Sequence, residues 1–268
     1  MKTKLNEQLI QSLVIGCKPV LNSDYRKDLY NIHENKKIGN YEIRKITIPR
    51  NTEQQFYTDK DGMCRCVFVD DYQSVQLREG KYNIWMSDTP MEFETNKKGI
   101  KLARGNVLEC GLGIGLFTYF ASKKKNVKMV TIVEKQKDVI ALVYPVIKNN
   151  KTDVINSDVS KFLRDTKQKF DMIHIDIWAD ILPYKEFTPL VKLATKRLTK
   201  NGVIVCWLDA LKEQVFNRLS KGIIESSGFA QYPPCMTCGK IYRTDYGGLC
   251  MDCADGLGIS ELFGRKMK

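Results

Sequence analysis

The chain has 268 residues, 43% of them hydrophobic, and a formal net charge of +12. This length suits one α/β domain with modest additions at each end. No stretch approaches 18 uninterrupted apolar residues, and Lys2 and Lys4 precede any apolar run. We therefore expect no membrane span and no secretory signal, and we assign the chain to the cytoplasm.

The first 80 residues are expected to form an N-terminal cap. Residues 9–20 are compatible with a helix, and residues 41–48 and 66–69 have the composition of strands. Two interpretations stay open, because the cap either carries substrate specificity or only covers the domain that follows.

Residues 106–115 are the most informative stretch. An apolar run ends in Glu109, and Gly111, Gly113 and Gly115 follow at alternate positions. The run predicts a buried strand, and the apolar spacing after Gly115 predicts a helix. Glycine lets the backbone approach a ligand where a Cβ would clash, so this strand, turn and helix predict a cofactor site. The spacing differs from the dinucleotide fingerprint, which has two residues before its last glycine.

Acidic residues also end or follow the next strands. Glu134 ends the second strand, about 20 residues past the glycines, where a carboxylate can bind two ribose hydroxyls. Asp158 follows the third strand and Asp176 lies near the end of the fourth. One such acid alone would more often cap a helix, but four in successive register favour a cofactor site. The strands after the first are predicted at residues 129–133, 153–155, 170–177 and 202–208.

Helical patterns separate these five strands, the last running from Leu211 to Ile223. Alternating strands and helices predict a doubly wound parallel sheet, that is, a Rossmann-like α/β fold with ligands beyond the carboxyl ends of the strands. We expect three units: a cap over residues 1–80, the α/β domain over residues 81–232, and a small module over residues 233–268.

The acid-x-Gly-x-Gly-x-Gly pattern resembles the first motif of class I S-adenosylmethionine-dependent methyltransferases. The resemblance covers roughly residues 84–210 and implies S-adenosylmethionine as the cofactor. It assigns the cofactor site to Glu109, the three glycines and Glu134, and it places Asp158 near the adenine amino group.

Residues 84–92 resemble the Met-x-x-Trp-Glu-Thr-Pro element of guanidinoacetate methyltransferase and its arginine-methylating relatives. That element packs over the bound cofactor, so the resemblance adds Trp85 and Thr89 to the cofactor site. Ser87-Asp88 replaces the Trp-Glu pair and residues 177–179 replace a Thr-Tyr-Pro sequence, so a guanidino substrate is not implied. Aminopropyltransferases of the spermidine synthase type share this sheet and remain an alternative.

The resemblance also indicates the chemistry. In the guanidinoacetate and polyamine relatives, an aspartate matching Asp176 orients or deprotonates an attacking nitrogen, which implies transfer to nitrogen. Trp178 and Asp180 follow on the same rim, where an aromatic wall and a second carboxylate suit a cationic or planar acceptor. Alternatively, Asp176 only caps the next helix and Trp178 packs against the N-terminal segment.

Four cysteines near the C-terminus form two Cys-x-x-Cys pairs, namely Cys235 with Cys238 and Cys250 with Cys253. This spacing predicts a zinc ribbon, and four thiolates leave no open position, so the zinc would be structural. Two disulfides are the rival interpretation, which the expected reducing compartment disfavours.

The positive charge leaves RNA or DNA open as the methyl acceptor, although much of it is lysine on outward helix faces. A small amine or a protein side chain is as good a candidate, and the oligomeric state is open. A third hypothesis is a non-catalytic protein whose zinc ribbon binds nucleic acid.

Overall fold

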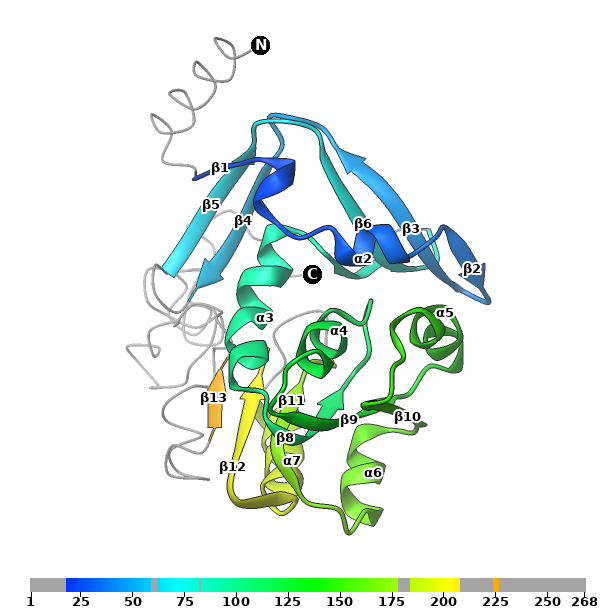
Figure 1. Cartoon of the computed structure of the whole chain (residues 1–268), viewed down its shortest axis with the longest axis vertical. Coiled ribbons are helices and arrows are strands. Elements are labelled where there is room, and N and C mark those ends of the chain that lie inside the picture. Colours follow the sequence, from blue (N-terminus) through cyan, green and yellow to red (C-terminus); the bar gives the residue numbers. More distant parts are fainter. Residues whose placement is uncertain (1–17, 59–61, 82, 178–183, 208–223, 227–268) are drawn as a thin grey trace, which may run out of the picture.

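The computed structural model describes residues 18–58, 62–81, 83–177, 184–207 and 224–226. The described chain has two parts. An N-terminal part made mostly of strands lies at the top of Figure 1, and an α/β part lies below it. None of the helices in these ranges is long and apolar enough to cross a membrane.

The α/β part contains a sheet in which every described strand runs parallel to its neighbours. The order across the sheet is β10 (Thr152–Asn156), β9 (Val127–Glu134), β8 (Gly105–Cys110), β11 (Phe170–Ile175), β12 (Leu198–Cys206) and β13 (Ile224–Ser226). The order reverses between β8 and β11, which is where ligands bind in open sheets of this kind. The predicted Rossmann-like α/β fold is therefore confirmed.

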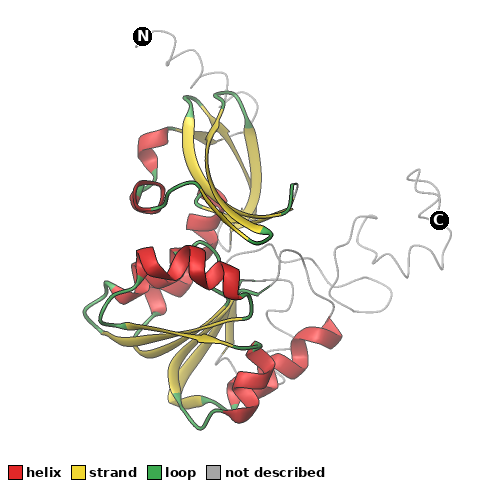
Figure 2. Ribbon diagram, turned by 90° about the vertical axis from the view of Figure 1, so that its right-hand side faces the viewer, coloured by secondary structure: helices red, strands yellow, loops and turns green. Residues whose placement is uncertain are grey.

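Helices cover both faces of this sheet (Figure 2). Side chains alternate along each strand, so Val107 on β8 packs into one core while its neighbour Leu108 packs into the other. The first core includes α3 (Pro90–Leu102), α4 (Leu116–Ser122) and α5 (Lys137–Ile147). The second includes α6 (Val159–Asp165) and α7 (Tyr184–Thr195). This packing holds the carboxyl end of β8 under α3 and α4.

The N-terminal part contains two small sheets. One has the antiparallel order β2 (Lys36–Ile38), β3 (Tyr41–Ile48), β6 (Tyr72–Glu79), β7 (Asn83–Ser87). The other has the order β1 (Lys18–Val20), β5 (Gly62–Phe68), β4 (Glu53–Thr58). Two short helical segments, η1 (Asn22–Asp24) and α2 (Asp28–Ile32), join β1 to β2.

The N-terminal part packs directly on the α/β part. Leu29, Ile43 and Leu77 share one hydrophobic core with Ile114 and Leu116. The buried His33 adds a polar link, because its Nε2 lies 2.9 Å from the carbonyl oxygen of Ile114 in the glycine turn. The cap is thus joined to the segment from which the candidate site is built.

The predicted elements agree with the structure to different degrees. The strand expected at residues 41–48 has those bounds, whereas the strands expected at 170–177 and 202–208 end two residues earlier than expected. The helix expected at residues 9–20 is wrong at its end, because Lys18–Val20 pairs with β5 as a strand. The parallel sheet contains one strand that was not predicted, β13. In the N-terminal sheet, β7 lies beyond the expected boundary at residue 80.

Candidate active site

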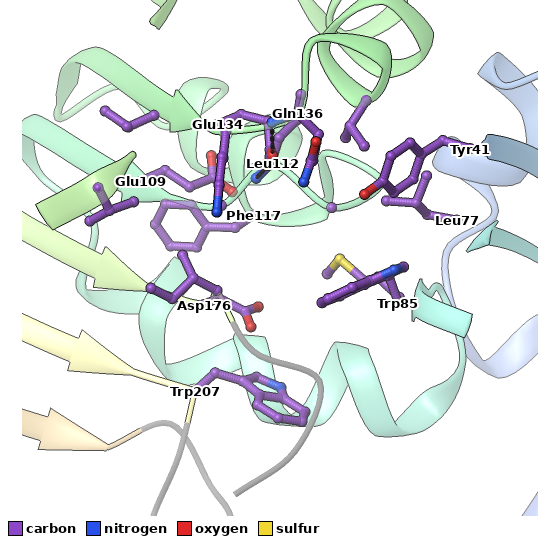
Figure 3. Close-up of a pocket in the computed structure, with 18 of the residues that line it drawn as sticks. Tyr41, Leu77, Trp85, Glu109, Leu112, Phe117, Glu134, Gln136, Asp176 and Trp207 are labelled. Atoms are coloured by element: carbon purple, nitrogen blue, oxygen red, sulfur yellow. Dashed lines mark hydrogen bonds between the residues drawn. The ribbon is translucent and has the colours of Figure 1, made fainter. Parts of the chain in front are cut away.

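A pocket of about 450 Å³ opens beside the glycine turn, at the carboxyl ends of β8, β9 and β11 (Figure 3). Its walls come from both parts of the chain: Tyr41 and Leu77 from the N-terminal sheet, Trp85 from β7, and Trp207 from the end of β12. Five acidic residues line it: Glu92, Glu109, Glu134, Asp158 and Asp176. The volume suits a ligand of nucleoside size.

The glycine turn between β8 and α4 needs its three glycines. Gly111, Gly113 and Gly115 have φ values of 94°, 52° and 80°, in the left-handed region that favours glycine. Packing adds a second requirement, since a Cβ on Gly113 would collide with the Met86 sulfur and one on Gly111 with the Asp176 carbonyl oxygen. The turn is therefore held closely against β7 and β11.

Several backbone amides of this turn are bonded within the protein. The amide of Leu112 donates to Oε2 of Glu134 at 3.0 Å, and the amide of Ile114 donates to the Met86 sulfur at 3.4 Å. The amides of Gly111 and Gly115 donate to the carbonyl oxygens of Val133 and Leu112. These bonds hold the turn in place. They also occupy backbone amides that could otherwise donate hydrogen bonds to a ligand.

Glu134 is fixed at the end of β9 by two backbone amides. Its Oε2 accepts from Leu112, and its Oε1 accepts from the amide of Gln136 at 2.8 Å. A carboxylate oxygen has two lone pairs, so each oxygen can accept another hydrogen bond from the pocket side. The side chain is half-buried and lines the pocket, which fits the predicted contact with ribose hydroxyls.

Three carboxyl groups lie at the deep end of the pocket. Glu109 is 3% exposed and Glu92 is 5% exposed. Burial, together with the nearby Asp176 charge, raises the pKa of both carboxyls well above the ordinary value. Asp176 is partly open to the pocket, and burial raises its pKa to about 7. Three neighbouring carboxylates that are shielded from water repel one another unless protons or a cation neutralise them.

Each of these acids is held by a neighbour. Thr118 Oγ1 on α4 donates to Oε2 of Glu109, and the backbone amide of Ser87 donates to the carboxyl of Glu92. The amide of Asp176 donates to the carbonyl oxygen of Cys110 at 2.9 Å, which docks the end of β11 against β8. In Figure 3 the Asp176 carboxylate points into the pocket, toward the side where Trp85 and Trp207 lie.

Aromatic and apolar side chains form the remaining walls. Trp207 is buried, and its Nε1 donates to Thr95 Oγ1 at 3.1 Å. Phe117 stacks on the buried His174 with ring centroids 4.0 Å apart. Ile84, Trp85 and Ile177 stay 48%, 42% and 38% exposed at the rim, so the pocket combines an acidic floor with an apolar mouth.

The pocket brings most of the predicted cofactor residues together. Its lining includes Trp85, Glu109, Gly111, Gly113, Glu134, Asp158 and the predicted catalytic Asp176. Asp158 also caps α6, since it accepts from the amide of Lys161 at 2.9 Å.

Two predicted residues are not part of the lining. Gly115 is the N-cap of α4 and packs against α5. Thr89 is the buried N-cap of α3, where its hydroxyl lies 3.0 Å from Ser87 Oγ and accepts from Gln54. Trp178, Asp180 and the four zinc-motif cysteines lie outside the described residues.

The structure adds three residues that the sequence-based reasoning missed. Tyr41 comes from a distant strand of the cap and has no local signal. Trp207 does have a local signal in the sequence, because it directly follows the carboxyl end of β12. The other predicted site residues lie at the same edge of the sheet. Glu92 belongs to the segment 84–92 that resembles a known motif. The sequence alone does not show that it faces the pocket, which follows from its position on the first turn of α3.

Several solved structures are similar to parts of this chain at low identity. The N-methyltransferase NodS from Bradyrhizobium japonicum WM9 is 19% identical with a TM-score of 0.38, over 44% of this chain and 67% of that chain. The spermidine synthase of Thermotoga maritima is 14% identical with a TM-score of 0.38, over 59% and 63%. The DhpI–SAH complex is 18% identical with a TM-score of 0.36, over 42% and 53%, so the chain spans about half of DhpI.

No curated protein matches the sequence. A family model does match, namely that of the spermine/spermidine synthase domain, over residues 82–246. This match takes in β7, the glycine turn and the whole strand edge on which the acidic pocket lies. It covers more than half of the 268 residues, and the chain therefore belongs to the spermine/spermidine synthase domain family.

Proposed function

We propose that this protein transfers an alkyl group from an S-adenosyl sulfonium donor to a nitrogen atom, with S-adenosylmethionine-dependent N-methyl transfer as the first candidate. The observation that carries the proposal is that Glu109, Glu134 and Asp176 surround one pocket at the glycine turn. Negative charge there suits a cationic sulfonium, and Glu134 has free lone pairs for a ribose diol.

The residues of the chain have two tasks in this reaction. When bound, the donor supplies an electrophilic carbon and a neutral thioether leaving group. Glu134 holds the ribose, so that the reacting carbon is presented in a fixed direction. Asp176, with a pKa of about 7, can hold an attacking nitrogen and take its proton near neutral pH.

Aminopropyl transfer is a second candidate, supported by the family membership and by the polarity of the pocket. The carboxylate of ordinary S-adenosylmethionine needs hydrogen-bond donors near the glycine turn. The amides of Leu112 and Ile114 are already bonded, and among the described lining residues Lys135 is the one basic side chain. A decarboxylated donor, which carries an amine in this region, would meet Glu109 and Asp176 without that conflict.

One experiment separates the two candidates. S-Adenosylmethionine and its decarboxylated form are titrated separately into the protein by calorimetry, and the products formed with a mixture of cellular amines are identified by mass spectrometry. A gain of one methyl group supports the first candidate, and a gain of an aminopropyl group supports the second. Failure of both donors to bind would contradict the proposed function.

The acceptor itself is proposed only as a nitrogen compound. The acceptor class is identified by following label from methyl-labelled S-adenosylmethionine into each fraction of a lysate. The candidates are RNA, DNA, a protein side chain and a small amine. Counts confined to one fraction identify the acceptor class.

We also propose that Cys235, Cys238, Cys250 and Cys253 hold one structural zinc ion. The support is their paired spacing, since four thiolates complete a tetrahedral site. Elsewhere, the residues that the structure describes contain no cluster of three or more His, Cys, Asp or Glu side chains suited to a metal ion, and the four cysteines lie outside them.

A further inference from the structure

The positive charge of the chain is concentrated at one edge of the parallel sheet. Because the strands are parallel, the segments that lead into β8, β9, β10, β11 and β12 lie at one edge, opposite the pocket. This amino edge comprises residues 101–106, 123–128, 148–153, 164–171 and 195–202. It contains fourteen Lys or Arg and three Asp, a net charge of +11, whereas the whole chain carries +12. The rest of the chain is therefore almost neutral.

Folding accounts for six of these cations. The helices between parallel strands end at the amino edge, where their free carbonyl groups attract positive charge. Five of the six donate to backbone carbonyl oxygens, and the sixth lies 3.9 Å from Asp28. The five are Arg104, Lys124, Lys151, Lys169 and Arg197, and the sixth is Lys123.

The other eight cations have no such role. All are exposed, and their side chains make no hydrogen bond or ion pair with any residue that the structure describes. They are Lys101, Lys125, Lys128, Lys148, Arg164, Lys167, Lys196 and Lys200. Repulsion between like charges destabilises a folded protein, so the fold itself gives no reason for this group.

The eight cations form a row that matches a polyanion. At least one of them precedes or begins each of the five strands. Neighbouring strands lie about 4.8 Å apart, so the row is roughly 20 Å long. This length corresponds to about six base pairs of B-form DNA, whose phosphates present one negative charge per ~1.7 Å of the helix axis.

Other polyanions fit this edge less well. Single-stranded nucleic acids bind by stacking on aromatic side chains, and the one aromatic residue of the amino edge, Phe170, is 2% exposed. Duplex RNA is bound across two successive minor grooves, over about 16 base pairs, which is longer than the row. An anionic membrane also requires inserted apolar side chains, and of the exposed large hydrophobic residues in the described ranges just Met129 and Val146 lie near this edge.

We propose that the amino edge is a docking surface for double-stranded DNA, which it binds through the phosphate backbone without reading the base sequence. The six residues of β8 separate this edge from the pocket by roughly 20 Å, so DNA docked there lies away from the pocket. The inference is therefore independent of the proposed transfer to nitrogen and does not concern the acceptor.

The test measures binding of the full chain to a fluorescein-labelled DNA duplex of about 24 base pairs by fluorescence anisotropy, between about 50 and 200 mM KCl. If four to six cations contact phosphates, the logarithm of the binding constant should fall with that of the salt concentration with a slope of about −4 to −5. A duplex of different sequence should bind within about threefold. An RNA duplex, single-stranded DNA and phosphatidylserine vesicles should each bind more weakly.

A triple variant, Lys125→Gln with Lys167→Gln and Lys200→Gln, removes free cations before or within three strands of the edge. It should weaken DNA binding at least about tenfold and make the salt slope shallower by about 2–3, since each lost phosphate contact changes it by about 1. The matched control is Lys18→Gln with Lys36→Gln and Lys37→Gln, which removes the same charge from exposed lysines on β1 and β2. The control should bind DNA within about threefold of the wild type.

Equal DNA binding in the two triple variants would overturn the assignment of the amino edge. Wild-type protein that binds no duplex DNA, or that binds duplex RNA, single-stranded DNA or vesicles at least as tightly, would overturn it as well. Thermal unfolding checks that the variants are folded, and the double variants Lys125→Gln with Lys200→Gln and Lys36→Gln with Lys37→Gln decide if a triple variant is not. S-Adenosylhomocysteine, titrated in parallel, should bind the wild type and the amino-edge variant within about threefold. Its failure to bind the wild type would contradict the proposed function, independently of the DNA result.

Discussion

The carboxyl groups of single residues in the pocket differ in their exposure to water, since Glu109 is buried while Asp176 and Glu134 are half-buried. Asp176 should be the base, so Asp176→Asn should lower turnover about 10²–10⁴-fold and change donor affinity only a few-fold. Since the base works in its ionised form, wild-type turnover should rise with pH through about 7, the pKa of Asp176. Initial rates from pH 5.5 to 8.5 check this, and a wild-type rate in Asp176→Asn would show that the role is wrongly assigned.

The same residue should limit stability. Its folded-state pKa lies above the ordinary aspartate value, so the stability that it contributes is complete at low pH and is lost as pH rises through about 7. Asp176→Asn should therefore make the ligand-free protein more stable at pH 8, by roughly 1–2 kcal/mol, and have a clearly smaller effect at pH 4.5. Urea unfolding at both pH values measures the difference. A less stable variant at pH 8 would mean that Asp176 is not under strain in the folded protein.

Glu134 is proposed to hold the ribose of the donor, which leads to a separate prediction. Glu134→Ala removes the carboxylate that is bonded to Leu112 and Gln136, and with it two proposed bonds to ribose. Adenosyl-ligand binding should weaken by about 1.5–3 kcal/mol per lost bond, as measured by calorimetry. Glu94→Ala is the control, because Glu94 on α3 bonds Tyr25 and Lys97 and does not line the pocket. Wild-type affinity in Glu134→Ala would argue against a ribose contact there.

At the scale of elements, the glycine turn should tolerate no side chain at its centre. Gly113→Val combines a left-handed φ with a collision against Met86, and it should abolish adenosyl-ligand binding and destabilise the fold by at least about 1–3 kcal/mol. Gly80→Ala is an informative control, because its φ of 62° is also left-handed while a Cβ there meets nothing closer than 3.7 Å. If both variants bind alike, the close approach of the turn is not needed.

The elements also show which parts of the fold can be predicted from sequence. The strands β8, β9 and β11 are mostly apolar, and their carboxyl halves are buried on both faces, so their existence and order follow from composition. In the cap, β3 is predictable from its composition. In contrast, β6 and β7 carry polar residues such as Gln73, Gln76 and Asn83; β6 is held by pairing with the distant β3, and β7 by pairing with β6. Tyr41 and Glu92 enter the site only through long-range packing.

At the scale of the whole molecule, the C-terminal cysteine motif should behave as a unit that depends on its metal. Protein purified without chelators should contain one zinc per chain. Removal of the metal should unfold the C-terminal module, because bound zinc supplies on the order of 10 kcal/mol to such small units, and should leave adenosyl-ligand affinity within a few-fold. Elemental analysis and calorimetry before and after chelation check both points. Protein without zinc would favour the disulfide interpretation.

The acidic pocket at the glycine turn is proposed to bind an adenosyl sulfonium donor. This is tested by calorimetric titration of S-adenosylmethionine, its decarboxylated form and S-adenosylhomocysteine into the wild type, Glu134→Ala and Glu94→Ala. We predict binding at one site per chain for at least one donor, weakened about a hundredfold or more in Glu134→Ala and unchanged in Glu94→Ala. Absence of binding by all three ligands to the wild type, or equal binding in the two variants, would contradict it.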